Sequence, residues 1–217
     1  MSKILVTGGA GYLGSILVPQ LLDEGHHVTV LDRFLYGETS ISALCTHPRF
    51  DVYRVDCRDF QAVKPHLAWP DVVIPLASLV GVPLGELNPV DARIINLEAQ
   101  LVLFRSLSAS QRIIMPTTES SYGKSGKLCT EDTPLNPLST YAKHKVEVEE
   151  ALMTRANSVS LRLATVFGMS PRMRLDLLIN DFTWKAYKEH SIVVFEGNYI
   201  RTSIHVTDAA KAFVHAL

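Results

Sequence analysis

Short runs of β-branched and other apolar residues alternate along the chain with longer segments of amphipathic periodicity. The apolar runs predict strands at residues 3–7, 27–31, 50–54, 71–75, 112–117 and 158–163. Apolar positions recur with helical spacing near residues 14–24, 89–108 and 139–156. This alternation predicts an α/β fold of the Rossmann type, a doubly wound parallel sheet with helices on both faces.

The alternation loosens beyond about residue 168. A helix is expected over residues 175–189, short strands at 192–195 and 202–206, and a last helix beginning near Thr207 and Asp208. Either of these two side chains would suit capping of the amides of Ala210 or Lys211. We divide the chain into a Rossmann-type domain at 1–168 and part of a smaller lobe at 169–217, with a segment that returns to the first domain. The last helix ends in an apolar run, which suggests that more protein follows.

The composition of the chain excludes several classes of function. The chain has 217 residues, of which 47% are hydrophobic and 20% are charged, and its formal net charge is -1. The near-zero charge argues against nucleic acid or a membrane surface as partner, and no apolar run resembles a bilayer span or a secretory signal. The cysteines Cys45, Cys57 and Cys129 are widely spaced without a CxxC pair. This suits reduced thiols in the cytoplasm and offers no metal-ligand spacing.

A glycine motif follows the first predicted strand. Gly9, Gly11 and Gly14 form G-x-G-x-x-G before an amphipathic helix. Glycines let the backbone approach a pyrophosphate, and the helix N-terminus offers amide donors. Asp32 closes the second strand at the distance this motif requires, where its carboxylate suits a ribose diol and repels the 2′-phosphate of NADP. Arg33 is the counter-argument, since a guanidinium there suits NADP; a plain tight turn with a surface aspartate is the alternative reading.

Tyr141 and Lys145 are spaced to share one face of a predicted helix. A lysine ammonium beside a phenol favours the phenolate, which would make Tyr141 a base near neutral pH. A tyrosine and a lysine at this spacing more often lie on the protein surface by chance than form a catalytic pair. Residues 116–123 (PTTESSYG) change this weighing, because they place several hydroxyls after the fifth strand, at the sheet edge where open α/β folds bind ligands.

Together these pieces resemble the extended short-chain dehydrogenase/reductase family, in particular its NAD-dependent nucleotide-sugar epimerases and dehydratases. The matching pieces are residues 7–14 (TGGAGYLG), Asp32, Asp56, Leu76 to Ser78, Asn96, residues 118–123, Tyr141, Lys145, residues 161–163 and residues 201–208 (RTSIHVTD). They follow the order of the family along essentially the whole chain.

The resemblance implies a role for each matching residue. Candidate cofactor-binding residues are Gly8, Gly11, Tyr12, Leu13 and Gly14 at the pyrophosphate, Asp32 and Arg33 at the adenosine ribose, Asp56 and Cys57 at the adenine, and Leu76, Ala77 and Ser78 along the cofactor channel. Asn96, also a candidate at the cofactor, would be structural or part of a relay; a polar side chain facing solvent is its alternative. Tyr141 and Lys145 are candidates both for catalysis and for cofactor binding. Tyr141 would be the acid/base, and Lys145 would bind the nicotinamide ribose and lower the Tyr141 pKa.

Candidate substrate-binding residues are Thr118, Glu119, Asn180 and Arg201. Thr118, the third candidate catalytic residue, would hydrogen-bond the reacting hydroxyl or carbonyl. Asn180 and Arg201 suit a nucleotide diphosphate, with a solvated surface as the alternative for both. Arg172 and Arg174 would likewise face either the anion or solvent.

Three departures from the family pattern refine the expectation. Pro75 replaces a histidine, which should perturb a strand end rather than the chemistry. Family 4,6-dehydratases place Asp and then Glu after the threonine; Glu119 can stand in for the first, but Ser120 cannot replace the second, which favours epimerisation over elimination. Family members also run on well beyond this length.

We therefore expect an NAD-dependent nucleotide-sugar epimerase that acts through a transient 4-keto sugar. A 4,6-dehydratase or 4-keto reductase is one alternative, and a non-catalytic NAD-binding regulatory protein is another. The resemblance also implies a homodimer through a four-helix interface formed by residues 89–108 and 139–156. Their apolar surface comes from Val102, Leu103, Phe104, Val146, Val148 and Leu152, although burial within one chain would give the same pattern.

Overall fold

Six parallel strands form the central sheet of the protein. The computed structural model describes residues 1–80, 87–126, 128–195 and 197–217. The strands are β1 (Lys3–Thr7), β2 (His27–Asp32), β3 (Phe50–Arg54), β4 (Val72–Pro75), β5 (Arg112–Thr118) and β6 (Ser158–Leu163). They lie in the order β3-β2-β1-β4-β5-β6, so the predicted Rossmann-type sheet is confirmed, with each expected strand within one residue of its observed bounds.

The order of the strands reverses beside β1. Val6 of β1 pairs with Val30 of β2 on one side and with Ile74 of β4 on the other. The connections from β1 and from β4 therefore leave the sheet in opposite directions. In open α/β sheets this point opens a crevice at the carboxyl ends of the strands, where ligands bind.

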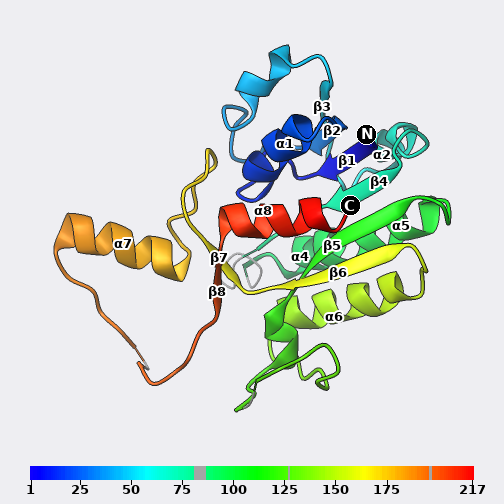
Figure 1. Ribbon diagram of the computed structural model, residues 1–217. Helices are drawn as coiled ribbons and strands as arrows, with labels where there is room; N and C mark the ends of the chain where they lie inside the picture. Colours follow the sequence, from blue (N-terminus) through cyan, green and yellow to red (C-terminus); the bar gives the residue numbers. More distant parts are fainter. Residues whose placement is uncertain (81–86, 127, 196) are drawn as a thin grey trace.

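Helices cover both faces of the sheet. They are α1 (Gly14–Asp23), α2 (Phe60–Val63), α4 (Pro89–Arg93), α5 (Ala99–Ser106), α6 (Thr140–Met153), α7 (Leu178–Glu189) and α8 (Val206–His215). Short turns of other helix types are η1 (Ser42–Thr46), η2 (Lys64–His66), η3 (Ile94–Glu98) and η4 (Glu119–Tyr122). Figure 1 shows α1 and α8 over one face of the sheet and α6 against the other.

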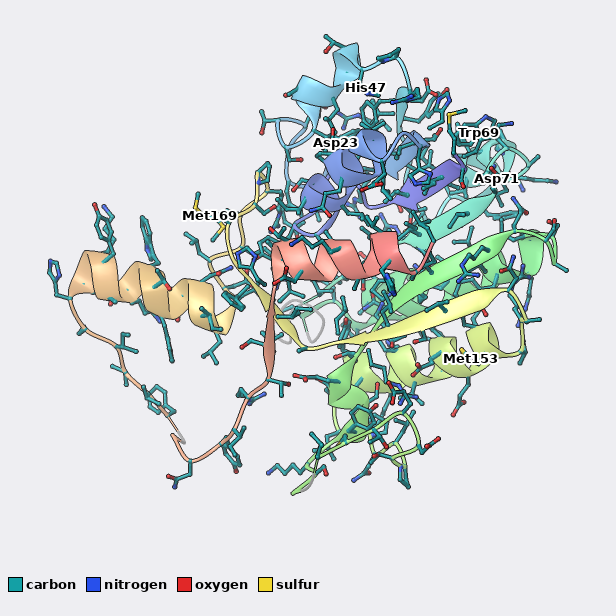
Figure 2. The ribbon with its side chains drawn as sticks, viewed as in Figure 1. Asp23, His47, Trp69, Asp71, Met153 and Met169 are labelled. Atoms are coloured by element: carbon teal, nitrogen blue, oxygen red, sulfur yellow. The ribbon has the colours of Figure 1, made fainter. Side chains whose placement is uncertain are left out.

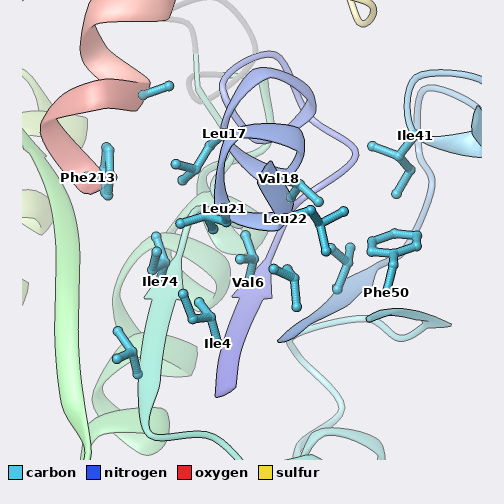
Figure 3. Packing of buried hydrophobic residues seen from close by; sticks show 14 of the residues in the cluster. Ile4, Val6, Leu17, Val18, Leu21, Leu22, Ile41, Phe50, Ile74 and Phe213 are labelled. Carbon is cyan, nitrogen blue, oxygen red and sulfur yellow. The ribbon is translucent and has the colours of Figure 1, made fainter. Parts of the chain in front are cut away.

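Alternate side chains of β1, β4 and β5 enter two separate cores. Ile4 and Val6 of β1 point to the face where Leu17 and Leu21 of α1 and Phe213 of α8 complete one cluster (Figure 3). The intervening residue Leu5 points to the other face and packs with residues of α5 and α6. Burial on both faces explains why these strands are continuous apolar runs rather than alternating ones.

The second half of the chain corrects several expectations. The segment from Ile192 to Phe195 is irregular and exposed, because β-branched residues form a strand only where a partner strand is available. Helix α8 begins at Val206, and its cap is the ring of His205, which accepts from the Thr207 amide, not the side chain of Thr207 or Asp208. The helix expected over 89–108 is interrupted by the π-helical turn η3.

A small lobe extends from the sheet after β6. It contains β7 (Thr165–Phe167), which pairs in parallel with β8 (Ser203–His205), and helix α7, which stands apart from the sheet in Figure 1. The chain then returns through α8, which packs against α1. The domain boundaries at 1–168 and 169–217 stay a prediction. Within the described ranges, no helix is both long and apolar enough to cross a bilayer.

The return of α8 predicts a stability effect. Phe213 is fully buried against the first core cluster, so Phe213→Ala should lower the free energy of unfolding by about 3–5 kcal/mol. Urea unfolding followed by circular dichroism measures this. Lys211→Ala, at an exposed position of the same helix, is the matched control and should change little. A loss below about 1 kcal/mol for Phe213→Ala would mean that α8 is not part of the core.

Candidate active site

The residues singled out in the sequence gather at the carboxyl ends of the strands. Gly8 follows β1, Asp32 ends β2, Asp56 follows β3, Ala77 follows β4 and Thr118 ends β5. Figure 2 shows Met169 on this side of the molecule, whereas Trp69 and Asp71 lie near the amino end of β1. The predicted cofactor and catalytic residues therefore share one edge of the sheet.

The glycine loop leaves no room for side chains. Gly8 has a φ of +74°, and a Cβ there would lie 2.6 Å from the Ala77 amide nitrogen. At Gly14 a Cβ would lie 2.5 Å from the Gly9 carbonyl oxygen. No side chain caps the N-terminus of α1, whose first turn also holds no acidic residue. The amides and the positive end of the helix dipole are thus suited to a pyrophosphate, as the motif requires.

Asp32 is held at the mouth of the glycine loop. Its carboxylate accepts hydrogen bonds from the amides of Ala10, at 2.9 Å, and Phe34, at 2.7 Å. These bonds fix the acidic group beside the loop, in the place where a ribose diol would meet it. The neighbouring Arg33 guanidinium lies 3.5 Å from the Asp56 carboxylate, so its charge is partly balanced by the protein itself.

Asp56 and Cys57 form a small polar cluster after β3. Arg58 donates to both carboxylate oxygens of Asp56, at 3.0 and 2.7 Å, and this hydrogen bonding lowers the Asp56 pKa. Burial raises the pKa of the Cys57 thiol to about 11, so it stays protonated. Asp56 therefore remains an acceptor next to a neutral, half-buried thiol. Among the described residues, no group of three metal-binding side chains is present.

Two amide side chains hold the segment after β4 in place. Asn96 is 1% exposed; its Oδ1 accepts from the Ser78 hydroxyl and the Leu79 amide, both at 2.7 Å, and its Nδ2 donates to the Leu79 carbonyl at 2.9 Å. The solvent-facing alternative for Asn96 is therefore wrong. Gln100, one turn later, donates to the Ala77 carbonyl at 3.1 Å. Sequence reasoning missed Gln100, although a glutamine four residues from an asparagine within an apolar helix was a usable signal.

Thr118, Tyr141 and Lys145 lie where β5 meets α6. Thr118 is 8% exposed, and its hydroxyl oxygen accepts from the Ser120 amide at 3.1 Å. The Lys145 ammonium donates to the Pro116 carbonyl at 3.1 Å, which ties α6 to the strand that ends in Thr118. The Lys145 nitrogen also lies 5.8 Å from the centre of the Tyr141 ring. The structure thus brings the three candidate catalytic residues to one place.

The electrostatics of this group differ from the expectation. Burial raises the pKa of Tyr141 to about 12, a rise that Arg174 opposes. Burial also lowers the pKa of Lys145 to about 8. The expected lowering of the Tyr141 pKa is therefore not found in the chain alone, because loss of hydration outweighs the favourable charges. At neutral pH the phenol keeps its proton, and the lysine is still largely charged.

Asn180 links the small lobe to the glycine loop. Its Oδ1 accepts from the Gly168 amide at 2.9 Å, and its Nδ2 donates to the Tyr12 hydroxyl at 3.1 Å and to the Arg174 carbonyl at 2.9 Å. The Tyr12 hydroxyl in turn donates to the Gly168 carbonyl at 2.6 Å. At 6% exposure Asn180 is not a solvated surface residue; its contact with a diphosphate stays a prediction.

The remaining substrate candidates lie on the small lobe or in contact with it. Glu119 accepts a hydrogen bond from the Thr202 hydroxyl, next to the exposed Arg201. Arg172 stacks on the ring of Tyr36 at 3.6 Å, and Arg174 forms an ion pair with Asp176. The structure does not bring Arg172 and Arg201 into a shared contact.

Most of the apolar residues expected at a dimer interface belong to the core instead. Leu103, Phe104, Val148 and Leu152 pack together between the sheet and helices α5 and α6. Val102 is 37% exposed, and Val146 is half-buried. The apolar excess of these two helices is thus largely explained within one chain, and the homodimer stays a prediction.

The crowding at Gly14 predicts a binding defect. In Gly14→Ala the new methyl group would meet the backbone of Gly9, so the loop must open, and we expect the Kd for NAD to rise about tenfold or more. Isothermal titration calorimetry measures this. Gly126→Ala is the control, since a Cβ there meets nothing within 4 Å. A Kd within twofold of the parent would show that the loop does not hold the cofactor.

The buried ammonium of Lys145 predicts a pH-dependent stability. Its pKa falls from the ordinary 10.5 to about 8 in the folded chain, so the unfolded chain binds more protons between these pH values. The free energy of unfolding therefore rises with pH across that window. Lys145→Met should be more stable than the parent by about 2 kcal/mol at pH 7, and this advantage should shrink by pH 10.

Urea unfolding at the two pH values measures the effect, with the exposed Lys143→Met as control on the same helix. Equal stability differences at pH 7 and pH 10 would contradict the depressed pKa.

Comparison with known proteins agrees with this geometry. Residues 4–217 match the NAD dependent epimerase/dehydratase family. The chain is 30% identical over 227 residues to a putative UDP-glucose 4-epimerase of Methanocaldococcus jannaschii. The aligned region covers 99% of this chain and 73% of that protein. The chain is also 29% identical over 226 residues to UDP-glucuronic acid decarboxylase 1 of Arabidopsis thaliana, covering 98% of this chain but 51% of that protein, so it spans about half the length of this relative.

The fold is shared with a UDP-glucuronic acid 4-epimerase from Bacillus cereus, solved in complex with UDP-glucuronic acid and NAD. The TM-score is 0.85 and the identity 28%, over 99% of this chain and 72% of that chain. The predicted resemblance and the predicted cofactor are both confirmed. The chain belongs to the NAD dependent epimerase/dehydratase family, and its cofactor is NAD.

Proposed function

We propose that the protein is a nucleotide-sugar 4-epimerase that uses NAD. The observation that carries this proposal is the hydrogen bond from Lys145 to the Pro116 carbonyl. It sets the helix that bears Tyr141 against the strand that ends in Thr118, and on this arrangement we expect an acid/base, a cation and a hydroxyl to face the crevice beside the glycine loop. Oxidation and reduction of a sugar hydroxyl require this combination of groups.

In this proposal each residue moves or holds a proton at a defined atom. Bound NAD supplies the hydride acceptor and donor. Tyr141 Oη, as the phenolate, accepts the proton of the sugar C4 hydroxyl as that carbon becomes a ketone. It returns this proton to the oxygen when the ketone is reduced after the sugar has turned its other face. Thr118 Oγ1 donates a hydrogen bond to the developing carbonyl oxygen. Arg174 opposes the burial that raises the Tyr141 pKa, which aids removal of the phenolic proton, and the Lys145 ammonium lies 5.8 Å from the centre of the ring.

The residues after Thr118 favour epimerisation over elimination of water. A 4,6-dehydratase needs an acid and a base here, in addition to the tyrosine. Glu119 is a carboxylate, but Ser120 follows it and has no basic group. A 4-keto reductase uses the same Tyr141 chemistry in one direction only and is separated from an epimerase by its product. The presence of Thr118, Tyr141 and Lys145 together argues against a non-catalytic NAD-binding protein.

The nucleotide diphosphate is assigned to the small lobe. Asn180 and Arg201 are the proposed ligands, with an amide and a guanidinium that suit phosphate oxygens. Asn180 lies beside Tyr12 of the glycine loop, so a diphosphate at this residue would lie close to the cofactor. Arg174 is near the same point, since its carbonyl accepts from the Asn180 amide.

Product analysis tests the proposal. The protein is incubated with NAD and with UDP-, dTDP-, GDP- and CDP-sugars, and the products are separated and weighed by mass spectrometry. We expect a new peak of unchanged mass with one of these substrates. Tyr141→Phe should lower the rate by about 10²–10⁴-fold, because the acid/base is lost, with the Kd for NAD within about twofold of the parent.

Each other outcome is informative. A product lighter by one water would overturn the epimerase and make the protein a dehydratase. A product heavier by two hydrogens, formed only with NADH, would make it a reductase. Bound NAD without any product would favour the non-catalytic protein.

A further inference from the structure

A buried polar network lies beneath the candidate catalytic residues, between α6 and the sheet. At its centre is Glu149 of α6, which is 6% exposed. Glu149 Oε1 accepts from the Ser160 hydroxyl at 2.5 Å, and Arg162 Nε lies 3.1 Å from both carboxylate oxygens. The Ser160 hydroxyl is in turn 2.8 Å from the hydroxyl of Thr117, the residue before Thr118.

The same network continues to the segment that follows β5. Arg162 Nη1 donates to the Tyr122 hydroxyl at 2.9 Å and to the Glu131 carbonyl at 3.2 Å. The guanidinium carbon of Arg162 lies 5.2 Å from the centre of the Tyr122 ring. Tyr122 ends η4, the turn that begins directly after Thr118. Glu149 is therefore connected to both sides of the candidate catalytic group.

Glu149 lies on the same face of α6 as Tyr141 and Lys145. Tyr141, Lys145 and Glu149 are spaced four residues apart, so they lie along one face of α6, which packs on the sheet. A rotation or slide of α6 would move Tyr141 away from Thr118. Lys145 fixes the middle of this face to Pro116. Glu149 fixes the next turn to β6 directly, and through Ser160 and Arg162 it is linked to β5 and η4.

A contribution to folding stability does not by itself explain why a buried ion pair of Glu149 and Arg162 is present. A buried ion pair loses the hydration of both charges, and a well-packed apolar pair often replaces it without loss. A satisfied buried network does, however, select one arrangement of the elements it joins. The network around Glu149 is of this kind, because Glu149 bonds to Ser160 and Arg162 of β6, and Ser160 in turn contacts Thr117 of β5.

We propose that Glu149 is a positioning residue, which holds α6 in the one register that keeps Tyr141 opposite Thr118. It acts through Ser160 and Arg162 and touches neither cofactor nor substrate. The effect on turnover rests on the proposed function, whereas the effect on the geometry of Tyr141 does not.

The geometry is tested without substrate. 3-Fluorotyrosine is incorporated at position 141 of the full chain, and its ¹⁹F resonance is recorded with NAD bound. We expect one narrow line in the parent chain and a shifted, broadened or split line in Glu149→Ala. Glu149→Gln, which keeps one acceptor oxygen, should be intermediate. Glu150→Ala, at the exposed neighbouring position, should give the parent line.

A second, milder variant keeps the test possible if Glu149→Ala does not fold. Tyr122→Phe removes only the hydroxyl that accepts from Arg162 and should also disturb the line, whether or not Glu149→Ala folds. An unchanged line in folded Glu149→Ala, or in Tyr122→Phe if Glu149→Ala does not fold, would overturn the proposal and leave Glu149 as a stabilising residue only.

Turnover gives a second readout if the product analysis yields a substrate. Glu149→Gln should then lower kcat about 10- to 100-fold, because small misplacements of reacting groups are costly, with KM and the Kd for NAD within about twofold. An unchanged kcat together with a lower Tm would count against positioning. If no substrate is found, the proposed function fails, and the ¹⁹F result still decides the role of Glu149.

Discussion

The close approach of two backbone segments at Gly8 is the constraint on which the cofactor crevice depends. The turn after β1 lies so near the segment after β4 that a single Cβ would meet the Ala77 backbone. The turn after β1 therefore requires a glycine with a positive φ at position 8, and the segment after β4 must be held in place by neighbouring side chains. Asn96 and Gln100 do this from η3 and α5, while Asp32 holds the glycine loop from the side of β2. The crevice is thus held in shape by contacts within the chain itself.

Burial sets the chemistry of the neighbouring edge. The Tyr141 phenol and the Lys145 ammonium both lose hydration where α6 packs on β5, and burial moves both pKa values towards the neutral forms. Lys145 keeps one carbonyl as a partner, whereas the carboxylate of Glu149, one turn further, is neutralised by Arg162. Helix α6 therefore carries the poorly solvated Lys145 ammonium beside the Tyr141 phenol, and one turn later Glu149, whose charge is balanced by Arg162. Because Glu149 is already paired with Arg162, the positive charge of Lys145 remains available next to Tyr141.

Polar contacts join the small lobe to the glycine loop and α1. Tyr12 of the glycine loop bonds to Gly168 and Asn180, and Ser15 of α1 meets Ser170 at 2.8 Å. Gly168, with a φ of +112°, lies against the ring of His205, where a Cβ would have no space. The lobe is consequently anchored through the loop that faces the cofactor. Beyond this anchor the lobe exposes Trp184, Tyr187 and Phe195, in contrast to the closed cores on both faces of the sheet.

The sequence by itself determined the sheet, the glycine loop and the identity of the catalytic candidates. Strands buried on both faces are continuous apolar runs, and the spacing of glycines, Asp32, Tyr141 and Lys145 reflects local geometry that a linear pattern can record. Only the tertiary structure decided the rest. The segment at Ile192 to Phe195 has strand-like composition but remains irregular, and His205 rather than Thr207 caps α8. The pKa of Tyr141, the partners of Asn96 and Asn180, and the link from Glu149 to Tyr122 all depend on burial and on contacts between residues distant in the chain. Local periodicity carries no information about such contacts, because they exist only once the helices have packed on the sheet.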